Sequence, residues 1–448
     1  MKKSEYNIFM EKKNCVLCYN SFTSSYLAIP NNVYEHFANK DLLSFQINYP
    51  KYYNSFKESG FIIEEEFDEL GSIRLDNRMK IFNPQDYFLM IYPTQDCNLK
   101  CWYCYENHVP NSFMKKEIHQ KIINHIKKIV TKKEYNSLHV TFFGGEPLLN
   151  NDTIALPLLE EIKCICDEVN VPFHCFFVTN ATLLSEEVIL KLQKFNPMFQ
   201  ITLDGNRKKH NSVRAFKSSD SGSFDTIINA FKLISEHIPL TNPQVESVAI
   251  IRINYDNSTL KSIDEIIDGI KDLDKRKFVI HLERVWQTKD KINDEQKKLL
   301  KNAIRKLSLL GFRVGHGIFG RRSYSCPAEI CNYAIINYDG LVYKCNGRNL
   351  EKDKADGILS ENGNIEWKTS CLIKRSSIAT FENEKCLECK MLPQCMGPCS
   401  QKQIEHGWGN IDKVCSLNAI DISLDDYLTL EFETKFIIEQ SKQAVTNA

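Results

Sequence analysis

The sequence predicts an α/β protein whose centre is a partial (β/α)6 barrel of the TIM type. From Tyr87 onward, apolar runs of strand length alternate with longer amphipathic stretches, a pattern typical of repeated βα units around a parallel sheet. The segments before about residue 80 and after about residue 320 lack this repeat, and the later one is rich in cysteine, glycine and proline. The chain has 448 residues, 43% of them hydrophobic, which is enough to build about two to three domains.

Composition and charge exclude several classes of function. The 57 Lys and Arg residues balance the 57 Asp and Glu residues, which argues against a nucleic-acid-binding surface and against an acidic disordered chain. The amino-terminal sequence lacks the apolar stretch of a signal peptide, and no run of about 18 apolar residues indicates a membrane span. We therefore expect a cytoplasmic protein that binds neither nucleic acid nor a membrane.

Residues 1–80 predict a small separate α/β module, because short apolar strings alternate there with helical stretches. Within it, Cys15 and Cys18 are either a redox or metal-binding pair or two half-buried thiols. The second interpretation is the commoner one for such cysteines.

Six apolar runs predict the strands of the barrel. The stretches between them carry apolar residues three and four positions apart, as in helices that cover a sheet, and a helix around residues 297–312 closes the region. The six runs are residues 87–93, 139–145, 174–180, 198–205, 245–254 and 277–285.

The 17 cysteines are the most informative feature of the composition. A reducing cytoplasm leaves few uses for them as disulfides and favours metal-binding or catalytic roles. The segment after about residue 320 shows little periodicity, so we expect it to need bound metal to stay folded.

Cys97, Cys101 and Cys104 follow the first predicted strand with the spacing Cys-x3-Cys-x2-Cys. Active sites of barrel enzymes lie at the carboxyl ends of the strands. Three thiolates can hold three irons of a cubic cluster and leave the fourth iron open to a substrate. The alternative is a zinc site completed by His108 or another residue, because zinc also prefers thiolates in a tetrahedral arrangement.

This motif resembles that of the radical S-adenosylmethionine (SAM) superfamily, which has the same spacing and an aromatic residue before the last cysteine, as Tyr103 is here. The resemblance implies a [4Fe–4S] cluster whose open iron binds the amine and carboxylate of S-adenosylmethionine. It also implies that an electron from the cluster breaks a carbon–sulfur bond and frees a 5′-deoxyadenosyl radical, which abstracts a substrate hydrogen. An external low-potential donor of the flavodoxin or ferredoxin type would supply that electron.

A second motif, Gly144, Gly145, Glu146 and Pro147, ends the second predicted strand. Glycines let the backbone approach a ligand closely, and exposed carbonyls with a carboxylate can bind an ammonium group. Alone, the motif could be a turn before a helix. In register with the three cysteines, it resembles the S-adenosylmethionine site of the superfamily.

Two weaker matches follow the third and fourth predicted strands. The segment FVTNATLL resembles the superfamily's TNGTLL, and Thr202 and Arg214 stand at its hydroxyl and arginine positions for the ribose and the methionine carboxylate. Each match could instead be a turn or a solvated basic loop. Asp204 and Gly205 predict a turn, whereas His210 has no assigned chemistry and is interpreted as structural.

The carboxyl-terminal segment carries eight further cysteines that fit two four-ligand sites, or two zinc ribbons by spacing alone. Their order resembles the SPASM domain, which binds two auxiliary [4Fe–4S] clusters in peptide- and protein-modifying radical enzymes. Full ligation implies electron transfer or substrate positioning there. The resemblance assigns Cys326, Cys331, Cys345 and Cys399 to the first auxiliary cluster and Cys386, Cys389, Cys395 and Cys415 to the second.

Two departures separate this chain from the anaerobic sulfatase-maturing enzymes, which it resembles closely. That group places an aspartate base after the third auxiliary cysteine, where Asn346 stands here, and an amide cannot take up a proton in that role. Phe143 stands where that group has glutamine. The sequence therefore favours a maturase that installs a crosslink or thioether in a ribosomally synthesised precursor peptide. Formylglycine generation in a sulfatase is an alternative, and a non-enzymatic zinc- or cluster-containing peptide-binding protein is the competing class.

The resemblance also implies a domain plan. Peptide maturases often begin with a winged-helix-like domain that binds a leader peptide as an added strand, and residues 1–80 are assigned this role, with a structural cap as the equal alternative. Residues 85–310 would form the radical SAM barrel, residues 320–425 the SPASM domain and residues 426–448 a terminal helix or tail. The sequence assigns no residue as catalytic acid or base.

Overall fold

The chain divides into two compact units, called here the first and the second unit. The computed structural model describes residues 1–219, 221–240, 247–285, 287–288, 292–316, 323–407 and 410–446. The first unit comprises Met1–Asn83, Ile318–Cys331 and Lys374–Glu433, and the second comprises Pro84–Gly317, Asn332–Ile373 and Thr434–Ala448.

The second unit is built on an 11-stranded open sheet, in the order β12-β11-β10-β9-β8-β7-β6-β13-β14-β15-β16. Strands β6 to β12 are parallel, β13 is parallel to β6, and β14 to β16 continue the sheet as an antiparallel meander. The strands are β6 (Asp86–Thr94), β7 (Ser137–Gly144), β8 (Phe173–Thr179), β9 (Met198–Thr202), β10 (Ala249–Tyr255), β11 (Phe278–Arg284), β12 (Arg313–His316), β13 (Tyr333–Ile336), β14 (Leu341–Tyr343), β15 (Gly357–Leu359) and β16 (Ile365–Trp367).

The predicted α/β fold with a partial barrel is confirmed. The six predicted strands correspond to β6 through β11, and the sheet stays open because β12 and β16 form its two edges. The sequence did not predict β12, whose four residues include Arg313, Gly315 and His316 and give no apolar run.

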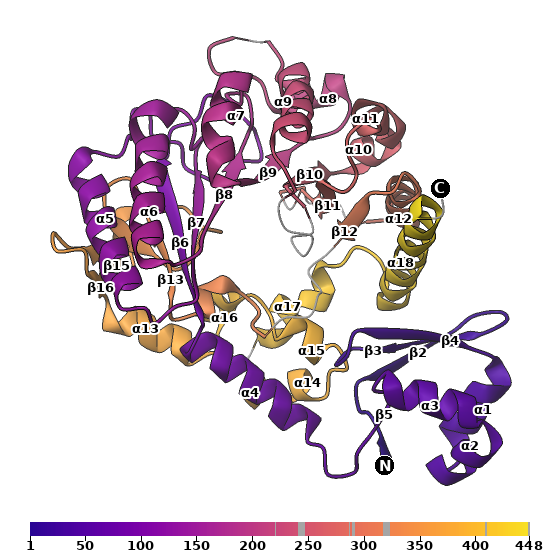
Figure 1. Ribbon diagram of the computed structural model, residues 1–448. Coiled ribbons are helices and arrows are strands. Elements are labelled where there is room, and N and C mark those ends of the chain that lie inside the picture. Colours follow the sequence, from indigo (N-terminus) through magenta and orange to yellow (C-terminus); the bar gives the residue numbers. More distant parts are fainter. Residues whose placement is uncertain are drawn as a thin grey trace. The chain divides into compact units, whose positions relative to one another are not determined.

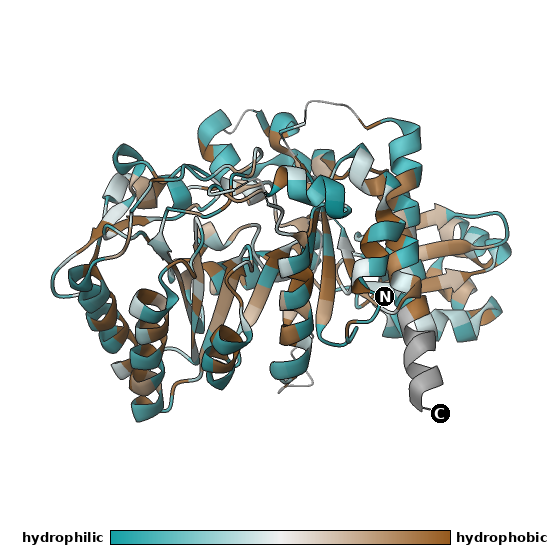
Figure 2. Ribbon diagram, turned by 90° about the horizontal axis from the view of Figure 1, so that it is seen from above, coloured by the Kyte–Doolittle hydropathy of each residue, from teal (hydrophilic) through white to brown (hydrophobic). Residues whose placement is uncertain are grey.

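Helices connect the parallel strands along the chain and cover one face of the sheet (Figure 1). They carry hydrophobic residues on one side and hydrophilic residues on the other (Figure 2), and in α5 the buried residues include Ile122, Ile126 and Ile129. Within the described residues, no helix has both the length and the apolar composition that a membrane span requires. These helices are α5 (Lys116–Thr131), α6 (Leu156–Val169), α7 (Glu186–Leu192), α8 (Arg207–Val213), α9 (Phe224–His237), α10 (Asn257–Lys261), α11 (Ile263–Ile270) and α12 (Asp294–Leu309).

Side chains alternate between the two faces of the parallel strands, as the pleat requires. Ile91, Phe142 and Phe177 are fully buried beneath the helices. Their neighbours along the strands, such as Thr141 and Phe176, are only half-buried on the opposite side. We call this opposite side the inner face of the sheet.

The amino-terminal part of the first unit is a three-stranded antiparallel sheet, in the order β2-β3-β4, with helices packed on it. Aromatic residues fill its core, among them Phe37, Phe45 and Phe56. Cys18 is fully buried in this core and Cys15 is half-buried, so Cys18 is a core residue. The elements are β1 (Lys2–Lys3), β2 (Asn7–Glu11), β3 (Val16–Asn20), β4 (Ser25–Ile29), β5 (Ile62–Ile63), α1 (Asn31–Asn39), α2 (Leu42–Asn48), α3 (Pro50–Glu58) and α4 (Glu69–Phe82).

The cysteine-rich tail of the first unit consists of short helices joined by loops. It packs against the amino-terminal part of the same unit, where Leu392 and Met396 contact Tyr6 and Ile73. Helices α13 and α18 contain boundary residues of both units. The helices are α13 (Thr369–Ser376), α14 (Glu384–Leu387), α15 (Leu392–Cys395), α16 (Ser400–His406), α17 (Ile411–Val414) and α18 (Leu424–Thr446).

Candidate functional site

The loop that follows β6 carries Cys97, Cys101 and Cys104. Asp96 organises its start, because its Oδ1 accepts a hydrogen bond from Cys97 N at 2.8 Å and its Oδ2 accepts one from Asn111 N at 2.9 Å. Asn180, which follows β8, donates from Nδ2 to Asn98 Oδ1 at 2.8 Å, and the same nitrogen lies 3.7 Å from Cys97 Sγ. These hydrogen bonds hold the path of this loop.

The three thiols of this loop interact electrostatically, and Cys97 is buried while Cys101 and Cys104 are half-buried. Burial raises the pKa of Cys97 to about 12 and that of Cys104 to about 11, and the Cys101 thiol contributes to both shifts. Such thiols become thiolates when a bound metal supplies positive charge, so this donor set fits three irons of a cluster. His108 Nε2 lies 3.5 Å from Cys104 Sγ, which places the alternative zinc ligand beside one thiol.

Gly144 and Gly145 bring the end of β7 against the cysteine loop. Gly144 has a φ of 116°, and a Cβ atom on either glycine would collide with a backbone carbonyl, that of Thr94 or that of Asp96. Gly145 N donates to Thr94 O at 3.2 Å, and Glu146 N donates to Asp96 O at 2.8 Å. The glycines are thus required by the contact between two backbone segments.

The carboxylate of Glu146 is fully buried and binds the protein itself. It accepts hydrogen bonds from Thr179 Oγ1 at 2.7 Å, Asn180 N at 2.7 Å and Leu148 N at 3.1 Å. Burial raises its pKa despite these bonds. Glu146 therefore joins the ends of β7 and β8. The predicted contact of Tyr103 and of the segment from Gly144 to Pro147 with S-adenosylmethionine stays a prediction.

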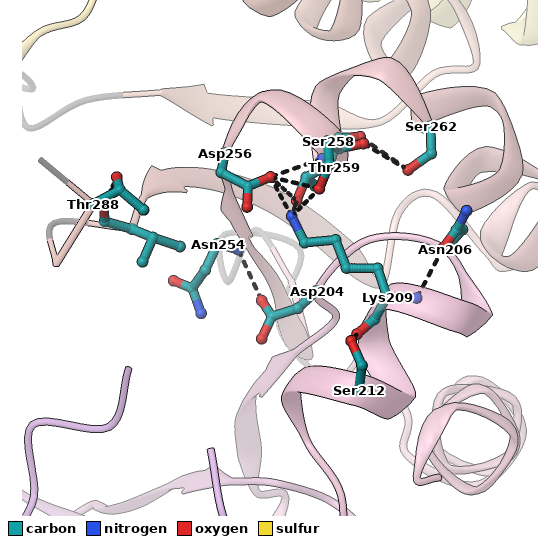
Figure 3. Close-up of polar contacts among 11 residues, drawn as sticks. Asp204, Asn206, Lys209, Ser212, Asn254, Asp256, Ser258, Thr259, Ser262 and Thr288 are labelled. Atoms are coloured by element: carbon teal, nitrogen blue, oxygen red, sulfur yellow. Dashed lines mark hydrogen bonds and ion pairs between the residues drawn. The ribbon is translucent and has the colours of Figure 1, made fainter. Parts of the chain in front are cut away.

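Arg214 belongs to a buried polar network around Tyr103, the aromatic residue before the last cysteine. The Nη1 atom of Arg214 donates to the Tyr103 hydroxyl at 2.7 Å, and the Tyr103 hydroxyl donates to Asp204 Oδ2. Nη1 also lies 3.6 Å from Asp204 Oδ2. Asn254 N donates to Asp204 Oδ1 at 3.2 Å, as Figure 3 shows. The buried Nε of Arg214 has no hydrogen-bond partner among the described residues, so this donor is free for an anionic ligand.

His210 connects the two charged members of this network. Asp204 N donates to His210 Nδ1 at 3.1 Å, which leaves the proton on Nε2 for a bond to Ser223 Oγ at 3.0 Å. Ser223 Oγ then donates to Arg214 O at 2.8 Å. His210 is fully buried, and burial together with Arg214 lowers its pKa to about 3, so it is a neutral positioning residue.

Lys209 joins helix α8 to Asp256, which follows β10, and to the first turn of α10 (Figure 3). Its Nζ forms an ion pair with Asp256 and donates to Ser258 Oγ at 2.7 Å and to Thr259 Oγ1 at 2.6 Å. This cation is therefore fully engaged inside the protein, and it holds the segment from Gly205 to Arg214 in place.

Thr202 ends β9, where it is half-buried and paired in register with Arg252 of β10. Its predicted contact with a ribose stays a prediction. The turn after β8 has Ala181 with a φ of 62°, where the superfamily sequence TNGTLL has glycine. Glycine suits this position in the superfamily sequence because the backbone is left-handed there, and in this chain Ala181 adopts the same left-handed conformation.

Four cysteines of the tail meet in one cavity of the first unit. Cys386, Cys389, Cys395 and Cys415 line a cavity of about 60 Å³, together with Leu392 and Ile411 among others. Burial raises the pKa of Cys386 to about 12, with further contributions from the other three thiols. These residues are the predicted ligands of the second auxiliary cluster, and as four facing thiols they fit such a cluster.

The predicted ligands of the first auxiliary cluster fall in different parts of the chain. Cys326, Cys331 and Cys399 belong to the first unit, and Cys345 follows β14 in the second. Their grouping stays a prediction. In the described part of the chain, no three His, Cys, Asp or Glu side chains are spaced to hold a single metal ion. A four-iron cluster needs a wider spacing, because each thiolate binds a different iron.

Sequence reasoning interpreted Asp204 as a turn residue and His210 as structural, so it did not place them in a network with Tyr103, and it did not single out Asn254. A signal existed for two of them: Asp204 lies two residues after Thr202, and His210 lies one helical turn before Arg214. Asn254 is brought to Tyr103 only by the pairing of β9 with β10, and its Nδ2 lies 3.3 Å from the Tyr103 hydroxyl.

Comparison with known proteins gives one family match and several relatives. The sequence pattern of the radical SAM superfamily matches residues 91–245, which include the cysteine triplet. The chain is 24% identical over 390 residues to the radical SAM cyclopropyl synthase TigE of Paramaledivibacter caminithermalis, covering 80% of this chain and 78% of TigE. It is 23% identical over 342 residues to the cysteine-type anaerobic sulfatase-maturating enzyme of Clostridium novyi, covering 70% of this chain and 88% of that enzyme.

Two solved structures share the fold. The structure of anSMEcpe with bound AdoMet has a TM-score of 0.53 and 20% identity, covering 81% of this chain and 99% of that one. The structure of Streptococcus suis SuiB bound to the precursor peptide SuiA has a TM-score of 0.50 and 16% identity, covering 90% of this chain and 96% of that one.

Proposed function

We propose that this chain, a radical SAM enzyme, modifies a residue of a ribosomally synthesised precursor peptide, with a crosslink or thioether as product. The observation that carries the proposal is the cavity lined by Cys386, Cys389, Cys395 and Cys415. A cluster-bearing tail after a radical SAM domain is the layout of the peptide-modifying enzymes that the sequence resembles. The names of the relatives fit this class, since SuiB binds a precursor peptide and TigE is a cyclopropyl synthase.

The residues of the second unit would bind and orient the cofactors. The superfamily implies a [4Fe–4S] cluster on Cys97, Cys101 and Cys104, which when bound supplies the electron that cleaves S-adenosylmethionine to a 5′-deoxyadenosyl radical. The free Nε of Arg214 would donate to the methionine carboxylate, and the Thr202 hydroxyl would bind the ribose. An external low-potential electron donor of the flavodoxin or ferredoxin type completes the set of partners.

The auxiliary clusters would complete the tail. We assign the second to the cavity of the first unit and the first to Cys326, Cys331, Cys345 and Cys399. With four thiolates each, these clusters have no open iron, so they would carry electrons or shape the peptide site.

The amino-terminal sheet of the first unit would bind the leader of the peptide. In the three-stranded order β2-β3-β4, strands β2 and β4 are edges with unpaired backbone groups, which can accept an added strand. Main-chain hydrogen bonds would give affinity with little dependence on the leader sequence.

Formylglycine generation is the second candidate, favoured by the likeness to the Clostridium novyi enzyme. Two residues argue against it: Asn346 cannot act as the base that the aspartate at this position provides, and Phe143 replaces a glutamine.

Anaerobic reconstitution followed by iron counting and an assay for 5′-deoxyadenosine tests the proposal. We expect three [4Fe–4S] clusters and reductant-dependent formation of 5′-deoxyadenosine, with a mass change in a precursor peptide encoded beside this protein. Cys101→Ala should abolish the nucleoside product and keep the auxiliary clusters, whereas Cys164→Ala, on the exposed side of α6, should change neither. Zinc without iron would support the non-enzymatic binding protein, and oxidation of a sulfatase peptide to formylglycine would support the second candidate.

A further inference from the structure

The inner face of the parallel sheet has two chemically different halves. On β6 to β8 the half-buried inner residues near the carboxyl ends are the apolar Met90, Phe143, Phe176 and Val178, and the uncharged Thr141, which lies in register between Met90 and Phe176. The Phe143 ring lies 5.3 Å from that of Tyr92, so this half is an aromatic wall beside the cysteine loop.

The other half, on β9 to β11, is polar and charged. Register pairs its inner residues across the strands, with Thr202 beside Arg252, Arg252 beside His281, and Asn254 beside Glu283. This half therefore contains the groups that can recognise a charge, whereas the wall on β6 to β8 can only bury apolar surface.

Arg252 differs from the other cations around the site because it has no acidic partner. Arg214 is paired with Asp204, and Lys209 with Asp256. Arg252 donates from Nε to Asn254 Oδ1 at 2.9 Å, and no ion pair joins it to any acidic side chain among the described residues. The nearby Glu283 lies 4.0 Å from His281 Nε2 on its own strand.

A half-buried guanidinium without a carboxylate carries a desolvation cost that an anionic ligand would offset. Its two terminal nitrogens form a planar fork that suits a carboxylate. Through Asn254, which also donates to the Tyr103 hydroxyl, Arg252 is tied to the cysteine loop. A ligand on Arg252 would therefore lie next to the S-adenosylmethionine site.

We infer that Arg252 binds a carboxylate of the substrate peptide while the apolar wall of Phe143, Phe176 and Val178 holds the side chain that reacts. This inference rests on the proposed function and names its substrate class: a peptide with an apolar residue at the reacting position and a carboxylate close by. The carboxylate comes from an acidic side chain or from the carboxyl terminus of the peptide.

Sheet geometry limits the distance between the two groups. Val178 on β8 and Arg252 on β10 are separated by two strand spacings, about 10 Å, and by two residues along the strands, about 7 Å, which together give about 12 Å. An extended peptide advances about 3.3 Å per residue, so the carboxylate should lie within about four residues of the reacting position.

The test uses the reconstituted full chain and synthetic nine-residue peptides with a fully deuterated leucine at the centre. One set carries Glu or Gln two residues from the leucine, and a second set ends two residues after it in a free carboxylate or an amide. Mass spectrometry measures deuterium transferred to 5′-deoxyadenosine. We expect about tenfold more transfer from the carboxylate than from the amide in at least one set, and the set that shows it identifies the source.

Variants of Arg252 show whether this residue binds the carboxylate of the peptide. Arg252→Gln should raise the KM of the carboxylate peptide, so that carboxylate and amide peptides transfer about equal amounts of deuterium. Arg252→Lys should retain part of the preference for the carboxylate peptide. Arg276→Gln is the matched control, because Arg276 is exposed and paired with Asp274 away from the inner face. An unchanged preference in Arg252→Gln, or an equal loss for carboxylate and amide peptides, would overturn the inference.

Two further outcomes separate this inference from the function on which it rests. Deuterium transfer from every leucine peptide without preference for a carboxylate would overturn the inference and leave the proposed function in place. Formation of 5′-deoxyadenosine with no deuterium from any peptide would count against peptide modification itself. A weaker binding of S-adenosylmethionine to Arg252→Gln, seen as a lost change in the cluster's EPR spectrum, would assign Arg252 to the cofactor and overturn the inference.

Discussion

The cysteine loop after β6 and the cysteine-rich tail are both proposed as sites for iron, yet they are held in different ways. In the loop, Asp96, Asn180 and Glu146 fix the backbone through hydrogen bonds from neighbouring strand ends. In the tail, helices α14, α15 and α17 have only four residues each, and the cysteines face one another across a cavity. The comparison teaches that neighbouring strand ends build the first site, whereas the second is built by short helices and loops, and we therefore expect it to depend on bound metal.

Removal of iron should therefore affect the two regions very differently, and this is the largest effect we expect. Chelation under anaerobic conditions should expose the backbone amides of residues 384–407 and 410–419, raising their hydrogen exchange by about a hundredfold or more, because structural metal binding is folding free energy. The amides of Cys97 and Glu146 should keep most of their protection, since they bind Asp96. Equal loss of protection in both regions would contradict the proposed difference between the loop and the tail in their dependence on metal.

Glu146→Gln tests the hydrogen bonds that build the first site. The carboxylate accepts three bonds in a fully buried place, and an amide can accept on only one of its two terminal atoms. We expect the free energy of unfolding of the second unit to fall by about 2 to 3 kcal/mol, measured by denaturant titration. Glu236→Gln on the exposed side of α9 is the control, and a matching small change in both variants would show that these bonds contribute little.

The second unit should also lose stability in mild acid. His125 is buried between the Tyr87 hydroxyl, 3.1 Å from Nε2, and Gly363 O, 2.8 Å from Nδ1, and burial lowers its pKa to about 4. The unfolded chain binds the proton below about pH 6.5, so stability is present above that pH and is lost as the pH falls. We expect a loss of about 2 kcal/mol between pH 7.5 and pH 5 from this residue.

Denaturant titrations at these two pH values measure this loss, and His125→Gln supplies the reference. The variant should show a weaker pH dependence by the same amount. If wild type and variant respond equally to acid, His125 is not neutral in the folded state.

Ala181→Gly should have the smallest effect. The φ of 62° at Ala181 costs an L-residue about 1 to 2 kcal/mol, and glycine removes this strain. Glycine also loses a buried methyl group and gains freedom in the unfolded chain, each worth about 0.5 to 1 kcal/mol. The thermal midpoint should thus shift by only a few degrees, whereas Ala181→Val should lower it clearly. A large loss in the glycine variant would contradict the left-handed turn.

The sequence predicted β6 to β11 of the 11-stranded sheet because strand patterns are local, and it missed β12 to β16, whose short segments give no long apolar run. The assignment of the cysteines to clusters stays a prediction. Apolar runs identified β6 to β11, and cysteine spacing identified the loop and the tail. The role of Glu146 inside the protein, the network of Asp204 and His210, and the unpaired state of Arg252 could not be predicted. Each of these depends on contacts between strands that are distant in the chain, such as Arg252 beside Thr202.

EPR spectroscopy of the reduced, reconstituted protein, with and without S-adenosylmethionine, tests the central claim most directly. The account predicts three clusters, of which one changes its spectrum when S-adenosylmethionine is added, and this response is lost in Cys101→Ala. It would be contradicted if S-adenosylmethionine changed no cluster signal, or if the change persisted in Cys101→Ala.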